Sequence, residues 1–105
     1  MIKQVEVREL EVLDVSSNRA EVRVSYTIPP QRGRGRAFGA QVFTCVLREG
    51  HEHVRLHIQG RDSKFGHWDV VRETWRPWDA ARQEMYSDLI KAIAEAALEE
   101  IRRVQ

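Results

Sequence analysis

Arginine and glycine alternate in a short stretch that follows two prolines, and this stretch is the first candidate for chemistry. It reads Pro29-Pro30-Gln31-Arg32-Gly33-Arg34-Gly35-Arg36. Glycine lets a backbone approach a phosphate chain closely, while arginine neutralises phosphates and stacks on bases. The spacing does not match a phosphate-cradling loop that leads through lysine into a helix. The stretch therefore predicts either nucleic-acid contacts through Arg32, Arg34 and Arg36 or a flexible hairpin loop kept soluble by its charge.

A histidine-rich segment is the second candidate. It reads His51-Glu52-His53-Val54-Arg55-Leu56-His57. In a strand, alternate side chains share a face, so the three histidines and Arg55 would lie together. His51 and His53 would lie roughly 6.6 Å apart, close enough to share zinc if another element added a ligand. A solvated face, a binding surface and a metal site are the alternatives; we expect no metal and assign Arg55 and His57 to a binding surface.

His57, Asp69 and His67 form a third candidate, a catalytic constellation. A His–Asp pair could orient a general base, but the reaction also needs a nucleophile or an activated water. Cys45 is expected on the core face, where a thiol is normally inert. Ser63 stands outside any nucleophile-elbow context. We therefore expect a non-enzymatic protein without catalytic residues and without a cofactor.

Three tryptophans, Trp68, Trp75 and Trp78, are interleaved with arginines, which is typical of a stacking platform for unpaired bases. Trp68 is expected in the core. Trp75 is expected on the histidine face, where it is the best candidate for an exposed aromatic contact. Packing of Trp75 and Trp78 against the start of the following helix is the alternative.

The elements that position these residues are mainly strands, because the first two thirds of the chain alternate with period two. Polar and apolar residues alternate most clearly from Ala20 to Ile28. The apolar phase slips in the first strand, and a β-bulge near Arg8–Glu9 would reconcile it. Turn signals stand at Ser16-Ser17-Asn18 and Glu49-Gly50. The expected strands cover residues 3–15, 20–28, 38–48, 52–59 and 67–75.

Matching the apolar faces of neighbouring strands sets their expected register, since a one-residue slip would invert every side chain. We expect Cys45 opposite Val54 and Phe43 opposite Leu56. Between the last two strands we expect Ile58 opposite Trp68, which places His57 opposite Asp69 as a favourable cross-strand pair. On the third strand, apolar residues also point away from the core, a pattern that usually marks an interaction site. They are Phe38, Ala40, Val42 and Val46.

One long helix should complete the domain. Pro77 stops the last strand, and Asp79 is the expected N-cap of a helix that runs to about Arg103. Its polar residues form one narrow stripe: Glu84, Asp88, Lys91, Glu95, Glu99 and Arg102. The remaining apolar surface is about twice as wide as an ordinary surface helix buries. A helix of about 37 Å would also overhang a strand of roughly 26 Å, so we expect a curved sheet, a homodimer, or both.

Length and composition limit the number of domains and the cellular compartment. The chain has 105 residues, which suits one domain (1–105), and a single cysteine, which excludes an intramolecular disulfide and favours a reducing compartment. We find neither a secretory signal nor a membrane span and expect a cytoplasmic protein. The net charge is +1, with the basic excess in residues 32–76. That excess is mostly arginine, which either serves phosphate contacts or reflects GC-rich coding.

The sequence therefore predicts an α+β fold, namely a five-stranded antiparallel curved β-meander with one long C-terminal helix packed on its concave face. The predicted function is a binding module for single-stranded nucleic acid through Arg32, Arg34, Arg36, Arg55, His57 and Trp75. The alternative is a protein-interaction or assembly module, a homodimer, that uses the apolar strand face and the helix. Salt separates the two, because only nucleic-acid binding should weaken steeply as salt rises.

Overall fold

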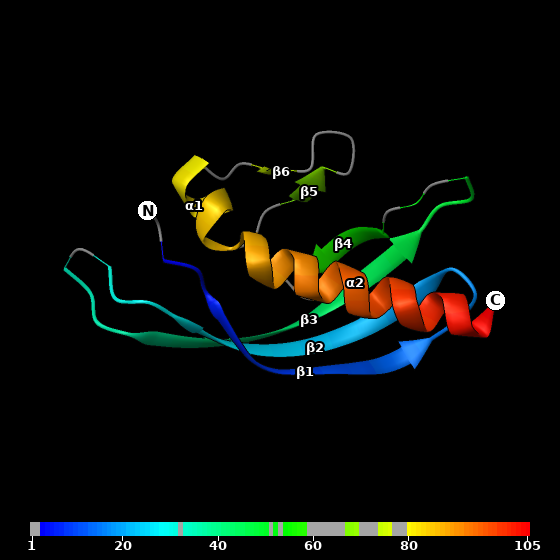
Figure 1. Cartoon of the computed structure of the whole chain (residues 1–105), viewed down its shortest axis with the longest axis horizontal. Helices are drawn as coiled ribbons and strands as arrows, with labels where there is room; N and C mark the ends of the chain where they lie inside the picture. Colours follow the sequence, from blue (N-terminus) through cyan, green and yellow to red (C-terminus); the bar gives the residue numbers. More distant parts are fainter. Residues whose placement is uncertain are drawn as a thin grey trace.

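A computed structural model describes residues 3–31, 33–50, 52, 54–58, 67–69, 74–76 and 80–105, with backbone alone for 58, 67–69 and 74–76. The fold is α+β: a four-stranded antiparallel meander sheet, in the order β1-β2-β3-β4, followed by a C-terminal helix that contacts the strands (Figure 1). The elements are β1 (Glu6–Val15), β2 (Arg19–Ile28), β3 (Ala37–Leu47), β4 (Val54–Ile58), β5 (His67–Asp69), β6 (Thr74–Arg76), α1 (Ala80–Met85) and α2 (Ser87–Val104).

The irregular phase of β1 is resolved by two bulges. The register shifts between Val7 and Glu9, which confirms the predicted bulge, and shifts again between Val12 and Asp14. Each bulge inserts one extra residue, so four unevenly spaced apolar residues all lie opposite core residues of β2. They are Val7, Leu10, Val12 and Val15, opposite Tyr26, Val24, Val22 and Ala20. The bulged residue Leu13 is 41% exposed, as expected for a side chain displaced from that face.

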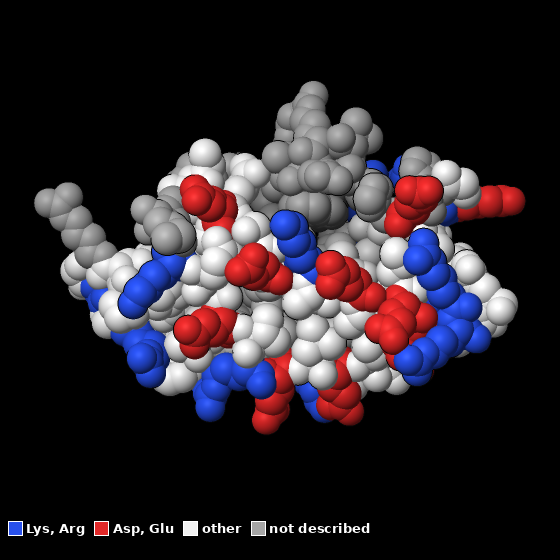
Figure 2. Space-filling view, in the orientation of Figure 1, with Lys and Arg blue, Asp and Glu red and all other residues white. Residues whose placement is uncertain are grey.

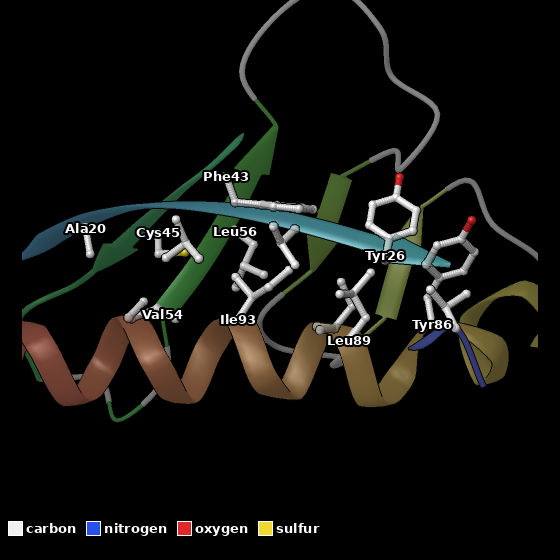
Figure 3. Close-up of a cluster of buried hydrophobic side chains, with 14 of the residues drawn as sticks. Ala20, Tyr26, Phe43, Cys45, Val54, Leu56, Tyr86, Leu89 and Ile93 are labelled. Carbon is white, nitrogen blue, oxygen red and sulfur yellow. The ribbon is translucent and has the colours of Figure 1, made fainter. Parts of the chain in front are cut away.

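The core lies between α2 and the face of the sheet that β2 fills with alternate residues. Ala20, Val22, Val24 and Tyr26 are buried, as the period-two pattern predicts. Side chains of β2, β3 and β4 point toward α2, and Leu89 and Ile93 of α2 point back (Figure 3). The polar stripe of the helix is exposed along its whole length, as predicted. Burial of the opposite, apolar side of α2, at Leu89, Ile90, Ile93, Ala97 and Ile101, is what holds the helix on the sheet.

The predicted register of β3 and β4 is wrong by two residues. Leu47 pairs with Val54, Cys45 with Leu56 and Phe43 with Ile58. The tight Glu49-Gly50 hairpin is also wrong, because the connection extends from Arg48 to the residue before Val54. A longer connection moves the register, but a shift of two keeps every side chain on its predicted face. Cys45 and Leu56 are accordingly buried.

The single fifth strand predicted for residues 67–75 is also wrong. The structure has two short strands there, β5 and β6, which pair with each other in a separate two-stranded sheet. Their register places Trp68 opposite Trp75 and His67 opposite Arg76. Among the described strand pairs, none joins β5 to β4, so the predicted register of Ile58 opposite Trp68 is not among them. Alternation alone could not reveal this reversal within one short apolar segment.

The C-terminal helix is two helices, and the N-terminal segment supplies the reason for the break at Tyr86. The backbone N–H of Val5 donates to the carbonyl oxygen of Met85 at 2.8 Å. Gln4 Oε1 accepts the backbone N–H of Asp88 at 3.1 Å and the Ser87 hydroxyl at 3.2 Å. Gln4 thus caps the start of α2 in the way an N-cap side chain does. The predicted N-cap, Asp79, lies outside the described residues.

The sheet, not the helix, has the longer reach. The 18 residues of α2 span about 27 Å, whereas the 11 residues of β3 span about 36 Å. The predicted helix overhang is therefore wrong. The β2–β3 hairpin instead extends past α1 at one end of the molecule (Figure 1). None of the described helices is long and apolar enough to cross a membrane.

Candidate interaction site at the β2–β3 hairpin

The predicted nucleic-acid residues fall in two separate places. Arg34 and Arg36 are exposed in the β2–β3 connection, and Arg32 lies outside the described residues. Arg55 and His57 lie on β4, opposite Val46 and Thr44 of β3. From Ala37 to Thr44 the strand runs about 23 Å, so Arg34 and Arg36 lie far along the sheet from Arg55 and His57. Trp75 belongs to β6, where only the backbone is described.

Arg55 and His57 do not stand on an open polar face. Both residues are half-buried, and Arg55 Nε is enclosed without a hydrogen-bond partner among the described atoms. The four apolar residues of β3 do lie on that outer face, as predicted. They range from Phe38, which is 64% exposed, to the half-buried Val42 and Val46. The guanidinium of Arg8, the residue inserted by the first bulge, lies 5.1 Å from the Phe38 ring centroid.

Acidic side chains along β1 weaken the case for a nucleic-acid surface on the outer face. Glu9 and Glu11 lie opposite Ser25 and Arg23 in the register of β1 and β2. Arg23 is engaged in an ion pair with Glu11. A polyanion approaching this part of the sheet would meet carboxylates, and like charges repel. The arginines of the hairpin are therefore the better-placed half of the predicted set.

At the hairpin end, β3 has an edge that pairs with none of the described strands. Along its whole length to Val46, β3 pairs with β2, but β4 pairs only with Phe43–Leu47. On the side away from β2, no described strand pairs with the preceding six residues, Ala37–Val42, which we call the β3 edge. In an antiparallel sheet alternate residues direct their N–H and C=O groups to each side. The β3 edge therefore presents backbone donors and acceptors outward.

A groove of about 670 Å³ runs beside the β3 edge. Its walls come from the end of β2, the hairpin, the β3 edge and α1. We call it the hairpin groove; it is lined by Tyr26, Ile28, Pro29, Gln31, Arg34, Gly35, Ala37, Phe38, Gly39, Ala40, Gln41, Arg82, Met85 and Tyr86. Its volume is within the range of roughly 300–1,000 Å³ that ligand pockets occupy.

Two tyrosines define the inner wall of the groove. The rings of Tyr26 and Tyr86 meet edge to face, with centroids 6.2 Å apart and an interplanar angle of 78°. They form the end of the buried cluster, with their hydroxyl groups directed away from α2 (Figure 3). The ring of Tyr26 lies over the backbone of β3 at Gly39, where an added Cβ would overlap the ring. Glycine at this position leaves the space that the Tyr26 ring occupies.

The hairpin itself is held in place against α1. The backbones of Gln31 and Arg34 exchange two hydrogen bonds, at 3.0 and 2.8 Å. Gly33 adopts the left-handed φ of 78° that this turn needs. Gln31 Nε2 donates to the sulfur of Met85 at 3.2 Å, across the groove. These contacts place Arg34 at the mouth of the groove.

Basic residues gather at this end of the molecule. Arg34 and Arg82 line the hairpin groove, and Lys3 and Arg36, together with Glu6, line a smaller hollow of about 230 Å³. Figure 2 shows basic side chains at the hairpin end and a row of mainly acidic ones along α2. Burial raises the pKa of the Tyr86 hydroxyl, and the charge of Arg82 opposes that rise. The groove thus combines two aromatic rings and Met85 with polar side chains and two arginines.

The described residues offer little to catalysis. Burial raises the pKa of Cys45 to about 12, so this thiol stays protonated and shielded in the core, as predicted. No cluster of three or more metal-binding side chains occurs among the residues that the structure describes. His51, His53 and Ser63 lie outside that part of the chain.

The sequence patterns identified Arg34 and Phe38 as candidate contact residues. They did not identify Tyr26, Gly39, Tyr86 and Arg82, which also line the groove. One signal was available. On the core-facing side of β3, the apolar residues stop at Phe43, and Gln41, Gly39 and Ala37 continue the same face. Small and polar residues there indicate that the helix does not cover this end of the strand.

Known protein families, curated proteins and solved structures contain no match to this chain.

Proposed function

We propose that this protein is a non-enzymatic interaction module that binds an extended polypeptide segment along the β3 edge. The observation that carries the proposal is the half-paired strand: Ala37–Val42 pairs with β2 on one side and with no described strand on the other. An unpaired edge is a template for another strand. Peptide recognition by strand addition uses such an edge, with main-chain hydrogen bonds giving affinity.

The composition of β3 supports this role. From Ala37 to Leu47 the strand carries neither a charged residue nor a proline. Natural edge strands usually carry lysine, proline or inward-pointing charges, which keep other strands away. The β3 edge has none of these features, and the small side chains of Ala37 and Ala40 leave space for a close backbone approach.

An added strand would contact two different surfaces, because its side chains alternate between the faces of the sheet. One set would enter the hairpin groove beside Tyr26 and Tyr86. The other set would lie on the outer face beside Phe38, which is 64% exposed. Backbone pairing would supply affinity, and these two surfaces would supply selectivity.

A displayed library of random heptapeptides, selected against the purified protein, provides the probes for the first test. A selected peptide is then compared with versions N-methylated at alternate positions, which lose backbone donors and keep their side chains. Methylation on the set facing β3 should abolish binding, and methylation on the other set should preserve it. Equal affinity for both methylated versions, or a library without any specific binder, overturns the proposal.

Hydrogen exchange locates the binding. Amides of Ala37–Val42 should exchange more slowly when the peptide is bound, while those of α2 remain unchanged. Ala40→Lys places a charge on the exposed edge and should weaken binding, whereas Ser17→Lys at the far β1–β2 turn is the matched control. Circular dichroism and thermal unfolding confirm that both variants fold. Protection confined to α2 would place the partner elsewhere.

A second copy of the chain is the competing occupant of the edge, and homodimerisation remains a proposal. Sedimentation equilibrium separates the two cases. A dimer through the β3 edge should dissociate in Ala40→Lys and should compete with the selected peptide. If the chain is monomeric at every concentration and still binds the peptide, the dimer is rejected and the peptide is the occupant of the β3 edge.

Single-stranded nucleic acid is the second candidate partner, favoured by the gathering of Arg34 and Arg36 with Lys3 and Arg82 at the hairpin end. Fluorescence anisotropy of a labelled single strand at low ionic strength tests it. Binding should fall steeply with salt and should weaken in the double variant Arg34→Ala, Arg36→Ala. A strand that does not bind at low salt, or that binds the variant equally well, removes this candidate.

A further inference from the structure

Resting on the proposed function, we infer that the segment bound at the β3 edge is acidic, with an apolar side chain entering the hairpin groove and a carboxylate beside Arg34. The inference concerns the chemical class of the peptide. It follows from the composition of the groove walls and from the position of the hairpin relative to the edge.

The inner part of the groove is suited to an apolar or aromatic side chain. Tyr26 and Tyr86 already meet edge to face at 6.2 Å, and such aromatic arrangements accept a further ring at offset or perpendicular geometry. Met85 and Ile28 add apolar surface, and methionine adapts its shape to different side chains. Every second side chain of the added strand would point toward this wall.

The margin of the groove is suited to an anion. Of the described residues that line it, two are arginines, Arg34 and Arg82, and none is aspartate or glutamate. Arg34 is exposed at the hairpin, while Arg82 comes from α1 on the opposite wall. Arginine is well suited to carboxylates because its planar fork donates two parallel hydrogen bonds. A basic segment would meet like charge at Arg34.

The hairpin places Arg34 within reach of the added strand. Its backbone is fixed by the paired hydrogen bonds with Gln31, and Ala37, where the β3 edge begins, follows only three residues later. A carboxylate near one end of the bound segment would therefore lie beside the guanidinium. Arg36 belongs to the same connection but lines the separate smaller hollow, which makes it a matched control.

The test uses three amidated heptapeptides of the selected sequence, which carry Glu, Gln or Lys at the position nearest Arg34. Fluorescence anisotropy measures their Kd for the full chain. The Glu peptide should bind about three- to tenfold more tightly than the Gln peptide. This is the change in Kd expected when one partly exposed ion pair is gained. The Lys peptide should bind more weakly than both.

Charge reversal assigns the effect to the groove. Arg34→Glu should remove the preference for Glu and improve binding of the Lys peptide, while Arg36→Glu should leave the order unchanged. Thermal unfolding checks the fold of both variants. If the three peptides bind the wild type equally, or if Arg36→Glu acts as strongly as Arg34→Glu, the acidic selectivity is overturned. Peptide binding itself then stands, because only the loss of every peptide contradicts the proposed function.

Discussion

The two halves of β3 have the same kind of sequence and different surroundings. Phe43–Leu47 lies between β2 and β4 beneath α2, and Phe43 and Cys45 are fully buried. Ala37–Val42 lies beside β2 alone at the edge of a groove, and Phe38 is 64% exposed. Apolar character therefore serves stability in one half and, in our proposal, recognition in the other. The halves differ in their described neighbours: β4 pairs with the first half, and no described strand pairs with the outer side of the second.

The comparison is sharpest for two phenylalanines on this one strand. Phe43→Ala should lower the free energy of unfolding by about 3–5 kcal/mol, because it leaves a cavity in a closed core. Phe38→Ala should cost no more than about 1 kcal/mol, the size of its contact with Arg8. Urea unfolding monitored by circular dichroism measures both. Similar costs for the two variants would show that the hairpin end is packed as tightly as the core.

Gly39 and Gly35 provide the next test, because they differ in what a Cβ would meet. Gly39→Ala would overlap the ring of Tyr26 and should cost about 1–3 kcal/mol, as overpacked positions do. Gly35→Ala meets nothing within 4 Å and should be nearly neutral. Thermal unfolding compares the two. In the double variant Tyr26→Ala, Gly39→Ala the glycine penalty should disappear, and its persistence would argue against the overlap.

The buried half of β3 should also show in the pH dependence of stability. The pKa of Cys45 is raised from 9.0 to about 12 by burial, so the thiolate forms more readily in the unfolded chain. The contribution of the protonated Cys45 thiol to the free energy of unfolding is therefore fully present well below pH 9 and is lost as pH rises toward 12. Between pH 8 and pH 10 the loss should be about 1.4 kcal/mol. Urea unfolding at both pH values measures the loss. Cys45→Ala should show a smaller loss, and an unchanged slope would contradict this origin.

The Gln4 cap lies at the first turn of α2, next to the groove residues Met85 and Tyr86. It therefore tests the boundary between the buried half of β3 and the half beside the groove. Gln4→Ala removes the acceptor for the Asp88 N–H and should cost about 1 kcal/mol. Lys3→Ala, at the exposed neighbouring position, is the control and should be nearly silent. Urea unfolding and hydrogen exchange at the first turn of α2 measure the effect; unchanged exchange there would show that Gln4 is not the cap.

Local patterns along the chain were sufficient for the strands β1 to β4 and for the faces they bury. Alternation from Ala20 to Ile28 predicts the buried residues of β2, and the slipped phase of β1 predicts its first bulge. The narrow stripe of polar residues predicts which side of the helix meets water. These features are local, because side-chain periodicity follows from the geometry of one strand or one helix.

Pairing and termination were decided by tertiary contacts. Val5 and Gln4 divide the helix at Tyr86 from a position some 80 residues earlier in the chain. The β3–β4 register depends on the length of the connection between the strands, which alternation does not predict. Alternation also does not predict that residues 67–69 and 74–76 form two paired strands, β5 and β6, where a single strand was expected. The hairpin groove follows from these endpoints. Arg34 was identifiable by residue type, but its proximity to Tyr26 and Tyr86 depends on contacts that only the folded chain brings together.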